Sequence, residues 1–135
     1  MKKIDIACIV DDDPIFVYGA KRMMELADFC NSFLIFNNGH DALHKLKTLI
    51  KCKDELPDLI LLDLNMPIMD GWQFLDNFTQ IKIDKKIIIY IVSSSIDPVD
   101  MERSKQYSSV SNFVVKPISV DKVKEIMQDV MKNNN

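Results

Sequence analysis

Five short apolar runs alternate along the chain with segments whose apolar residues recur at helical spacing. The predicted strands are Ile4–Val10, Phe33–Phe36, Leu59–Leu62, Ile87–Val92 and Phe113–Val115. Their side chains are apolar with few exceptions, as expected for strands that are covered on both faces. Strands that alternate with helices in this way form a parallel sheet with helices on both sides. We therefore expect an α/β protein with a doubly wound, flavodoxin-like (βα)5 fold and strand order 2-1-3-4-5.

The segments between these strands carry the signals of amphipathic helices. Pro14 and Pro98 stand where the first turn of a helix tolerates proline, and Asp70-Gly71 precedes a further apolar pattern. Asn37–Gly39 has the composition of a turn. Helical spacing is clearest in two apolar stripes, namely Ala42, Leu43, Leu46, Leu49 and Ile50, and Val120, Val123, Ile126, Met127, Val130 and Met131.

The balance of charged and apolar residues excludes several classes of protein. The chain has 17 Lys and Arg against 20 Asp and Glu, a net charge of −3, and 47% hydrophobic residues. This composition excludes a disordered chain, and it disfavours a nucleic-acid-coating protein, which would show a basic excess. Ile87–Val92 is the longest apolar run, and Leu59–Leu62 is another. Both are far shorter than the ~20 residues that cross a bilayer, so we expect no membrane segment.

Chain length and cysteine spacing bound the organisation of the protein. With 135 residues, we expect residues 1–135 to form one domain. Cys8, Cys30 and Cys52 are widely spaced, odd in number and without a CxxC pair. This pattern favours reduced thiols in a cytoplasmic protein over a disulfide framework or a zinc site.

Polar residues follow four of the five predicted strands directly. Asp11–Asp13 follow the first strand, Asp63 follows the third, Ser93–Ser95 follow the fourth, and Lys116 follows the fifth. Because the carboxyl ends of parallel strands share one edge of the sheet, these side chains should meet in one crevice. In open α/β sheets this edge carries the ligand site, at the switch point between the first and third strands.

Such a cluster of carboxylates is costly unless a cation binds to it. Two like charges 4 Å apart repel by about 4 kcal/mol at an effective dielectric constant of 20. One lysine cannot neutralise three or four carboxylates, whereas Mg²⁺ prefers oxygen ligands of this kind. Carboxylates, Mg²⁺, a lysine and a hydroxyl are also the groups that phosphoryl transfer requires, and an aspartate can serve as the nucleophile.

Each of these residues also has a structural explanation when it is taken alone. An aspartate at a strand end is commonly a helix cap, and for Asp13, before Pro14, the cap and the functional role are equally good explanations. Ser93 alone would be a cap and Lys116 alone a solvated lysine. The functional interpretation depends on the joint placement of Asp12 and Asp63 on adjacent strands at the switch point.

At these positions the chain resembles the receiver domain of two-component response regulators, of the single-domain type seen in chemotaxis regulators. The resemblance extends from about Ile4 to Met131. The matching segments, in order, are Ile9–Pro14, Leu61–Pro67, Met69–Gly71, Val92–Ser94 and Val114–Pro117. Each segment is common by itself, whereas the ordered set at these spacings is specific.

The resemblance implies a phosphorylation site with a magnesium ion. It makes Asp63 the phosphoacceptor and a ligand of Mg²⁺. It makes Asp12 the principal Mg²⁺ ligand, with Asp11 supporting the ion directly or through water. The main-chain carbonyl of Asn65 would be a further ligand.

The resemblance also implies a conformational switch. Lys116 would pair with Asp63 or its phosphoryl group, and the Lys116–Pro117 peptide would be cis. Ser93 would donate its hydroxyl to the phosphoryl group, which would leave room for Phe113 to turn inward. The face made by the fourth helix, fifth strand and fifth helix would report the change to a partner. Its candidate members are Val99, Met101, Tyr107 and Phe113.

The expected partners are a sensor histidine kinase or a histidine phosphotransfer protein, and an unknown downstream protein. We expect no output domain and therefore no direct contact with nucleic acid. The protein would be a signalling switch that catalyses its own phosphorylation and slow dephosphorylation, not a metabolic enzyme. Two departures from the family pattern bear on its output: Ser93 replaces the commoner threonine, and Phe113 lacks a tyrosine hydroxyl. By the same resemblance, Asn65, Ser94 and Ser95 occupy positions that vary in the family and tune the lifetime of the phosphoryl group.

Two other functions fit part of the pattern. Asp11–Asp13 after a strand resembles the DxD motif of haloacid-dehalogenase-like Mg²⁺ phosphatases, but no paired acidic motif follows Lys116 on a further strand. A phosphate-independent, receiver-like binding module would be expected to lack Asp12, Asp63 or Lys116, and all three are present.

His40 and His44 have metal-binding spacing on a helix, but no third ligand is evident, which favours surface histidines.

Overall fold

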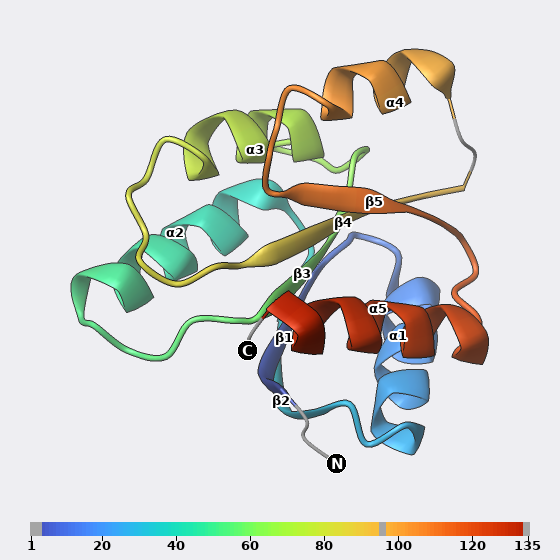
Figure 1. Cartoon of the computed structure of the whole chain (residues 1–135). Coiled ribbons are helices and arrows are strands. Elements are labelled where there is room, and N and C mark those ends of the chain that lie inside the picture. Colours follow the sequence, from blue (N-terminus) through green and yellow to red (C-terminus); the bar gives the residue numbers. More distant parts are fainter. Residues whose placement is uncertain (1–3, 95–96, 134–135) are drawn as a thin grey trace.

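The computed structural model of the chain describes residues 4–94 and 97–133, with the side chain of Asn133 excepted. Ser95 lies outside the described residues. Within them, parallel strands form one sheet in the order β2-β1-β3-β4-β5, which confirms the predicted fold class and topology. The strands are β1 (Ile4–Val10), β2 (Cys30–Phe36), β3 (Leu59–Asp63), β4 (Ile88–Ser93) and β5 (Val110–Val115) (Figure 1).

A helix follows each strand along the described chain. The helices are α1 (Pro14–Leu26), α2 (Gly39–Lys51), α3 (Gly71–Phe78), α4 (Pro98–Ser104) and α5 (Val120–Asn133). Helices α1 and α5 cover one face of the sheet, and α2 and α3 cover the other. Each of the five described helices begins after a side chain that accepts a backbone N–H, as helix caps do. These residues are Asp13, Asn38, Asp70, Asp97 and Ser119.

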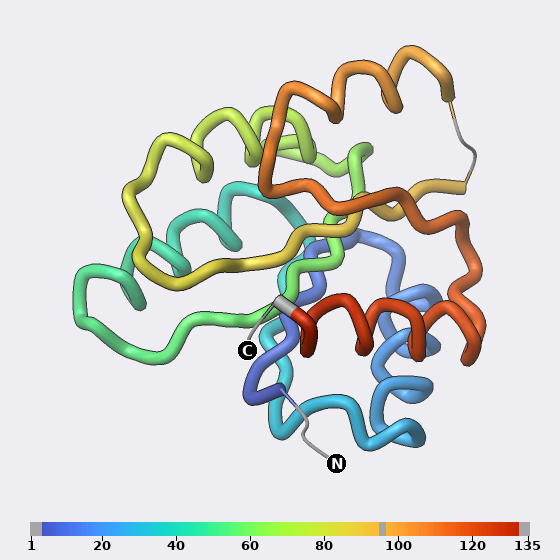
Figure 2. Tube along the Cα trace, in the orientation of Figure 1, coloured from blue at the N-terminus to red at the C-terminus, as the bar shows by residue number. Residues whose placement is uncertain are grey.

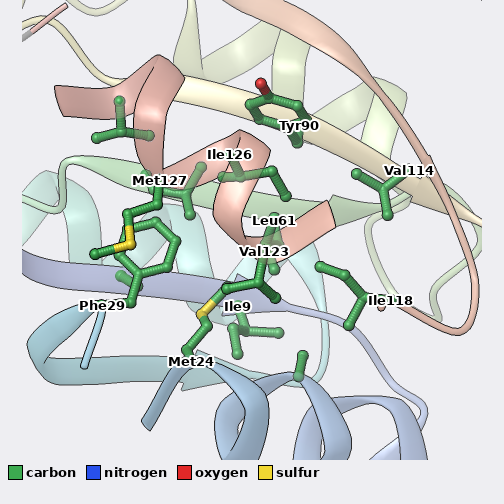
Figure 3. Packing of buried hydrophobic residues seen from close by; sticks show 14 of the residues in the cluster. Ile9, Met24, Phe29, Leu61, Tyr90, Val114, Ile118, Val123, Ile126 and Met127 are labelled. Atoms are coloured by element: carbon green, nitrogen blue, oxygen red, sulfur yellow. The ribbon is translucent and has the colours of Figure 1, made fainter. Parts of the chain in front are cut away.

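The alternation of side chains along the strands divides the core into two clusters. In β1, Ala7 and Ile9 face the α1/α5 side, and Cys8 and Val10 face the α2/α3 side. In Figure 3, Ile9 and its neighbours pack against Val123 and other α5 side chains on the first side. Because both faces of the sheet are covered, β3 is buried throughout and β1 is buried from Ala7 to Val10. The polar side chains at the carboxyl ends of these strands therefore stand out against an apolar interior.

The structure lengthens the two edge strands relative to the prediction from sequence. Strand β2 begins at Cys30 instead of Phe33, and β5 begins at Val110 instead of Phe113. Their first residues include exposed polar side chains, which an edge strand tolerates because part of it remains in contact with water. These side chains are Asn31, Ser32, Ser111 and Asn112. The predicted turn Asn37–Gly39 is also shorter, because Asn38 caps α2 and Gly39 is its first residue.

Gly71 allows α3 to begin directly against the end of β3. A Cβ atom at this position would lie 2.5 Å from the main-chain oxygen of Asp63 and 2.9 Å from the Cα of Leu64. The Gly71 N–H donates a hydrogen bond to the Leu64 carbonyl, at 2.9 Å. Both contacts are with backbone, which cannot move aside without displacing Asp63. The absence of a side chain at Gly71 therefore helps to place Asp63.

We predict that Gly71→Ala lowers the free energy of unfolding by about 1–3 kcal/mol, because the new methyl group overpacks a rigid backbone. The matched control is Gly19→Ala in α1, where an added Cβ meets no atom within 4 Å. The control should raise stability by about 0.5–1 kcal/mol, the ordinary advantage of alanine over glycine inside a helix. Urea denaturation measures both. Equal effects of the two substitutions would contradict the close contact at Gly71.

Candidate functional site

The polar side chains expected at the strand ends are brought together at one edge of the sheet. Asp63 is the last residue of β3 and pairs in register with Val92, which is followed by Ser93 at the end of β4. Asp11 follows β1, and Lys116 follows β5. The ends of these four strands lie along the same edge in the chain trace (Figure 2).

Three carboxylates form the centre of the site. Asp11, Asp12 and Asp63 each offer an oxygen atom, and these atoms lie within 4.8 Å of one another. Asp11 and Asp63 are 2% and 6% exposed, whereas Asp12 faces solvent. Among the described residues this is the one group of three or more carboxylate, imidazole or thiol ligands that could hold a metal ion. His40 and His44 are exposed on α2 and form no such group.

Lys116 is the cation of the site, and it lies closer to Asp11 than to Asp63. Its Nζ atom is 2.9 Å from Asp11 Oδ2 and 3.9 Å from Asp63 Oδ2. The resemblance implied that Lys116 pairs with Asp63, whereas the shorter ion pair is with Asp11. The Lys116 N–H donates to the Ser93 carbonyl at 2.8 Å, and the Lys116–Pro117 peptide is cis, as the resemblance implied.

Burial and neighbouring charge make the ionised form of Asp63 unfavourable. Desolvation is the main cause, and the negative charge of Asp11 adds to it. The Lys116 ammonium and a hydrogen bond from the Asn65 main chain act in the opposite direction. Together these effects raise the pKa of Asp63 to about 7. Without a further cation, this carboxyl therefore keeps its proton to a higher pH than an ordinary aspartate does.

The geometry fits a divalent cation with oxygen ligands. Asp11 Oδ2 is buried and makes no hydrogen bond of good geometry with the described residues, although the Lys116 ammonium lies near it. Three carboxylates face one ammonium ion, so two negative charges remain. Mg²⁺ accepts carboxylate and carbonyl oxygens at such sites. The hydrogen bond of the Asn65 main chain keeps the segment after β3 beside the cluster, and its carbonyl as a metal ligand stays a prediction.

Asp13 has a structural role in this arrangement. Its Oδ1 accepts the N–H of Ile15 at 3.0 Å and caps α1, and its own N–H donates to Asp11 Oδ1 at 2.9 Å. The sequence left a helix cap and a functional role equally open for Asp13, and the structure shows the cap. The cap also orients Asp11, because one carboxylate oxygen of Asp11 holds the first turn of α1 and the other faces Lys116.

The residues expected to form the switch lie beside this site. Ser93 is half-buried at the end of β4. Phe113 is 8% exposed, and its ring packs into the α2/α3 side of the core. The ring is therefore already inside the protein in this structure. Val99 and Met101 are exposed on α4.

Two groups of contacts near the site were not foreseen from the sequence. Tyr107 stacks on Trp72 at a centroid distance of 5.8 Å and donates a hydrogen bond to Asp76, and Arg103 lies over the Trp72 ring. These contacts join α3 to α4 and to the segment between α4 and β5. In the second group, the Lys116 Nζ atom lies 4.9 Å from the ring centroid of Phe16. Nothing in the sequence distinguishes Phe16 from an ordinary core residue of a helix.

Comparisons with known proteins agree with this geometry. The family model of the response regulator receiver domain matches residues 7–128. A Clostridium acetobutylicum protein named protein-glutamate methylesterase/protein-glutamine glutaminase is 31% identical over 134 residues, which cover 98% of this chain and 36% of that protein. The chain thus spans just over a third of that relative. Sporulation initiation phosphotransferase F of Bacillus subtilis is 29% identical over 87 residues, covering 64% of this chain and 68% of the relative.

A solved structure extends the similarity to the whole fold. The crystal structure of a two-component response regulator from Cytophaga hutchinsonii has a TM-score of 0.88 and 27% sequence identity, and the match covers 97% of this chain and 99% of that one. Among the described residues, no helix is both long enough and apolar enough to cross a bilayer.

We predict that Mg²⁺ stabilises the protein, because the cation relieves the repulsion among the three carboxylates. At ten times its Kd, the ion should add about 1.4 kcal/mol to the free energy of unfolding. Thermal unfolding with and without Mg²⁺ measures this. The stabilisation should be lost in Asp12→Asn and kept in Asp84→Asn, which alters an exposed carboxylate on another loop. A melting temperature that millimolar Mg²⁺ leaves unchanged would count against the metal site.

We predict that Asp63→Asn stabilises the metal-free protein, and does so more at pH 8 than at pH 5. The folded protein keeps a proton on Asp63 up to about pH 7, whereas the unfolded chain loses it near the ordinary pKa of 3.8. Wild-type stability should therefore fall as pH rises between about 4 and 7, and asparagine removes this dependence. The extra stabilisation at pH 8 should be about 2–3 kcal/mol. Urea denaturation at the two pH values in a chelator measures it, and a pH-independent difference would contradict the raised pKa.

Proposed function

The chain belongs to the response regulator receiver domain family of two-component systems, and from this premise we propose that Asp63 is the residue that accepts the phosphoryl group. The observation that carries the proposal is the position of the Asp63 carboxylate at the end of β3, buried beside two aspartates and a lysine. Receiver domains are signalling domains, and we propose that this one acts as a switch and not as a metabolic enzyme.

In the proposed reaction, the ionised Asp63 carboxylate attacks the phosphorus atom of a phosphohistidine or a small phosphodonor. A new P–O bond forms to Asp63, the bond from phosphorus to the donor breaks, and the leaving group takes the electron pair. Asp63 must be ionised to attack. Burial and the charge of Asp11 raise its pKa and disfavour this form, and a bound cation would favour it. Lys116, 3.9 Å from Asp63 Oδ2, is within reach of the incoming phosphoryl oxygens.

The proposed cofactor is Mg²⁺, held by Asp12 and Asp63, with the main-chain carbonyl of Asn65 and support from Asp11. When bound, the ion would offset the negative charge of the carboxylates and of the phosphoryl group, which makes the approach of two anions possible. Asp11 would also keep Lys116 in place through the 2.9 Å ion pair. Ser93, at the end of the neighbouring strand, would donate its hydroxyl to a phosphoryl oxygen.

The proposed output is a change in the face formed by α4, β5 and α5. Movement of Ser93 toward the phosphoryl group would change the space beside Phe113, whose ring is buried in the present state. The negative charge of a phosphoryl group on Asp63 would thus change which packing of the switch residues is favoured. The exposed Val99 and Met101 side chains on α4 are suited to contact a downstream protein.

The proposed phosphodonor is a sensor histidine kinase or a histidine phosphotransfer protein, and the proposed location is the cytoplasm. The similarity to a sporulation phosphotransferase supports a role in phosphoryl transfer. The three cysteines are free thiols, which supports a reducing compartment. A phosphatase that used Asp11 as its nucleophile is disfavoured, because Asp11 is buried and held by Lys116 and by the Asp13 N–H.

We predict that incubation with phosphoramidate and Mg²⁺ adds a single phosphoryl group to the wild-type protein. Intact-mass spectrometry detects the adduct, which should be absent without Mg²⁺ and absent in Asp63→Asn. Asp84→Asn, with its exposed carboxylate far along the chain, should be labelled like the wild type. An adduct that persists in Asp63→Asn would show that another residue is the acceptor. Multiple turnover on phosphate esters that requires Asp11 would favour the phosphatase. No adduct together with no Mg²⁺ binding would favour a phosphate-independent module.

A further inference from the structure

The ammonium group of Lys116 has an aromatic neighbour that the proposed chemistry does not require. The ring of Phe16 lies under it, with 4.9 Å between Nζ and the ring centroid. Ammonium ions within about 6 Å of an aromatic centroid are attracted by the ring's electron-rich face. Phe16 is 7% exposed and the Lys116 side chain is 16% exposed, so both groups lie largely outside bulk water.

The first turn of α1 fixes where this ring stands. Asp13 caps the helix, Pro14 is its first residue, and Phe16 is its third. The Asp13 N–H donates to Asp11 Oδ1, and the other oxygen of Asp11 lies 2.9 Å from the Lys116 ammonium. Asp11 and Phe16 are thus tied to the same turn, and both contact Lys116. The two contacts define the position of the ammonium group from two directions.

This position has a consequence for Asp63. With Nζ at 2.9 Å from Asp11 and 3.9 Å from Asp63, the lysine forms its close ion pair with the neighbouring carboxylate and not with the proposed nucleophile. An Asp63 oxygen engaged by a close ammonium partner would be a weaker nucleophile, because its lone pair would be shared with the cation. The ammonium is about 1 Å farther from Asp63 than from Asp11. At that distance it leaves the lone pair of Asp63 available and can still reach a phosphoryl oxygen.

A cavity beside the Phe16 ring leaves room for the Lys116 ammonium to move unless the ring holds it. A space of about 340 Å³ opens between α1 and the segment after β5, and its lining includes Phe16, Gly19, Met23, Lys116 and Pro117. An ammonium ion is strongly hydrated and flexible on its four-carbon stem. Without the ring, water from this cavity could solvate Lys116 and let it move among the carboxylates. A residue of equal hydrophobicity but without a π face would fill space and would not hold the charge.

We propose that Phe16 is a positioning residue, whose ring holds the Lys116 ammonium beside Asp11 and off the Asp63 carboxylate until a phosphoryl group arrives. The effect on phosphorylation rests on the proposed function of Asp63, whereas the contact between ring and ammonium does not. The two parts can therefore be tested separately in the same set of variants.

The first experiment observes Lys116 directly by NMR in the metal-free protein with labelled lysine. A proton that lies over an aromatic ring is shifted upfield, so the Hε protons of Lys116 should be upfield of those of the other lysines. Phe16→Leu should remove this shift, and Phe16→Tyr, which keeps the ring, should retain it. Phe29→Leu is the matched control, because Phe29 is buried in the same core cluster. This control should lower stability in a similar way and leave the Lys116 signals unchanged.

The second experiment measures the rate at which phosphoramidate labels each variant in Mg²⁺. Phe16→Leu should slow labelling by roughly three- to tenfold, the range expected for loss of one cation–π contact. Phe16→Tyr and Phe29→Leu should label at close to the wild-type rate.

Several results would overturn the proposal. Unshifted Lys116 protons in the wild type would show that the contact does not exist in solution. Equal labelling rates for wild type and Phe16→Leu would show that the contact has no effect on the reaction, and a loss of rate in Phe29→Leu of the same size would reduce Phe16 to a packing residue. If the wild type accepts no phosphoryl group at all, the function proposed for Asp63 fails, and the NMR shifts still decide whether Phe16 positions Lys116.

Discussion

The repulsion among three carboxylates at one edge of the sheet is the constraint on which the rest of the site depends. Asp11 and Asp63 are almost fully buried, and Asp12 lies beside them with its side chain in solvent. One ammonium group, that of Lys116, faces all this charge. Burial of charge near like charge is unfavourable, so the fold must hold these groups in place against their own repulsion. The raised pKa of Asp63 is the direct expression of this cost, and it leaves the site able to gain much from a cation.

The sheet supplies the rigidity that this arrangement requires. The register between β3 and β4 sets Asp63 opposite Val92, and the same ladder leads to Ser93. Behind these ends, apolar side chains fill both faces of the sheet, so a strand that slid by one residue would exchange the side chains of the two core clusters and disrupt the packing of both. The chain also uses backbone contacts at close range, since α3 begins at Gly71 directly against the Asp63 carbonyl. The position of the proposed nucleophile is thus fixed by packing that contains no charge.

The difference between local apolar patterns and contacts between distant segments explains what the sequence could and could not predict. The fold class, the strand order and the joint location of Asp12, Asp63 and Lys116 follow from local patterns, because apolar runs mark strands and parallel strands align their ends. The starts of β2 and β5 were predicted three residues too late, because edge strands accept polar residues. The preference of Lys116 for Asp11, the buried ring of Phe113 and the contact with Phe16 depend on side chains from segments far apart in the chain. No periodicity in the sequence encodes such contacts.

The contacts between α3 and α4 join the acidic site to the proposed output face in consecutive steps. Gly71 lies against the Asp63 backbone, and the next residue, Trp72, stacks on Tyr107 and lies under Arg103 of α4. Tyr107 is also hydrogen-bonded to Asp76 on α3. Helix α4 is short, and Ser104 is its one buried residue, so these side chains supply much of what holds it to the described body of the protein. A helix held by a few polar and aromatic contacts, and not by a deep apolar face, requires little free energy to shift, which is the property that a signalling surface needs.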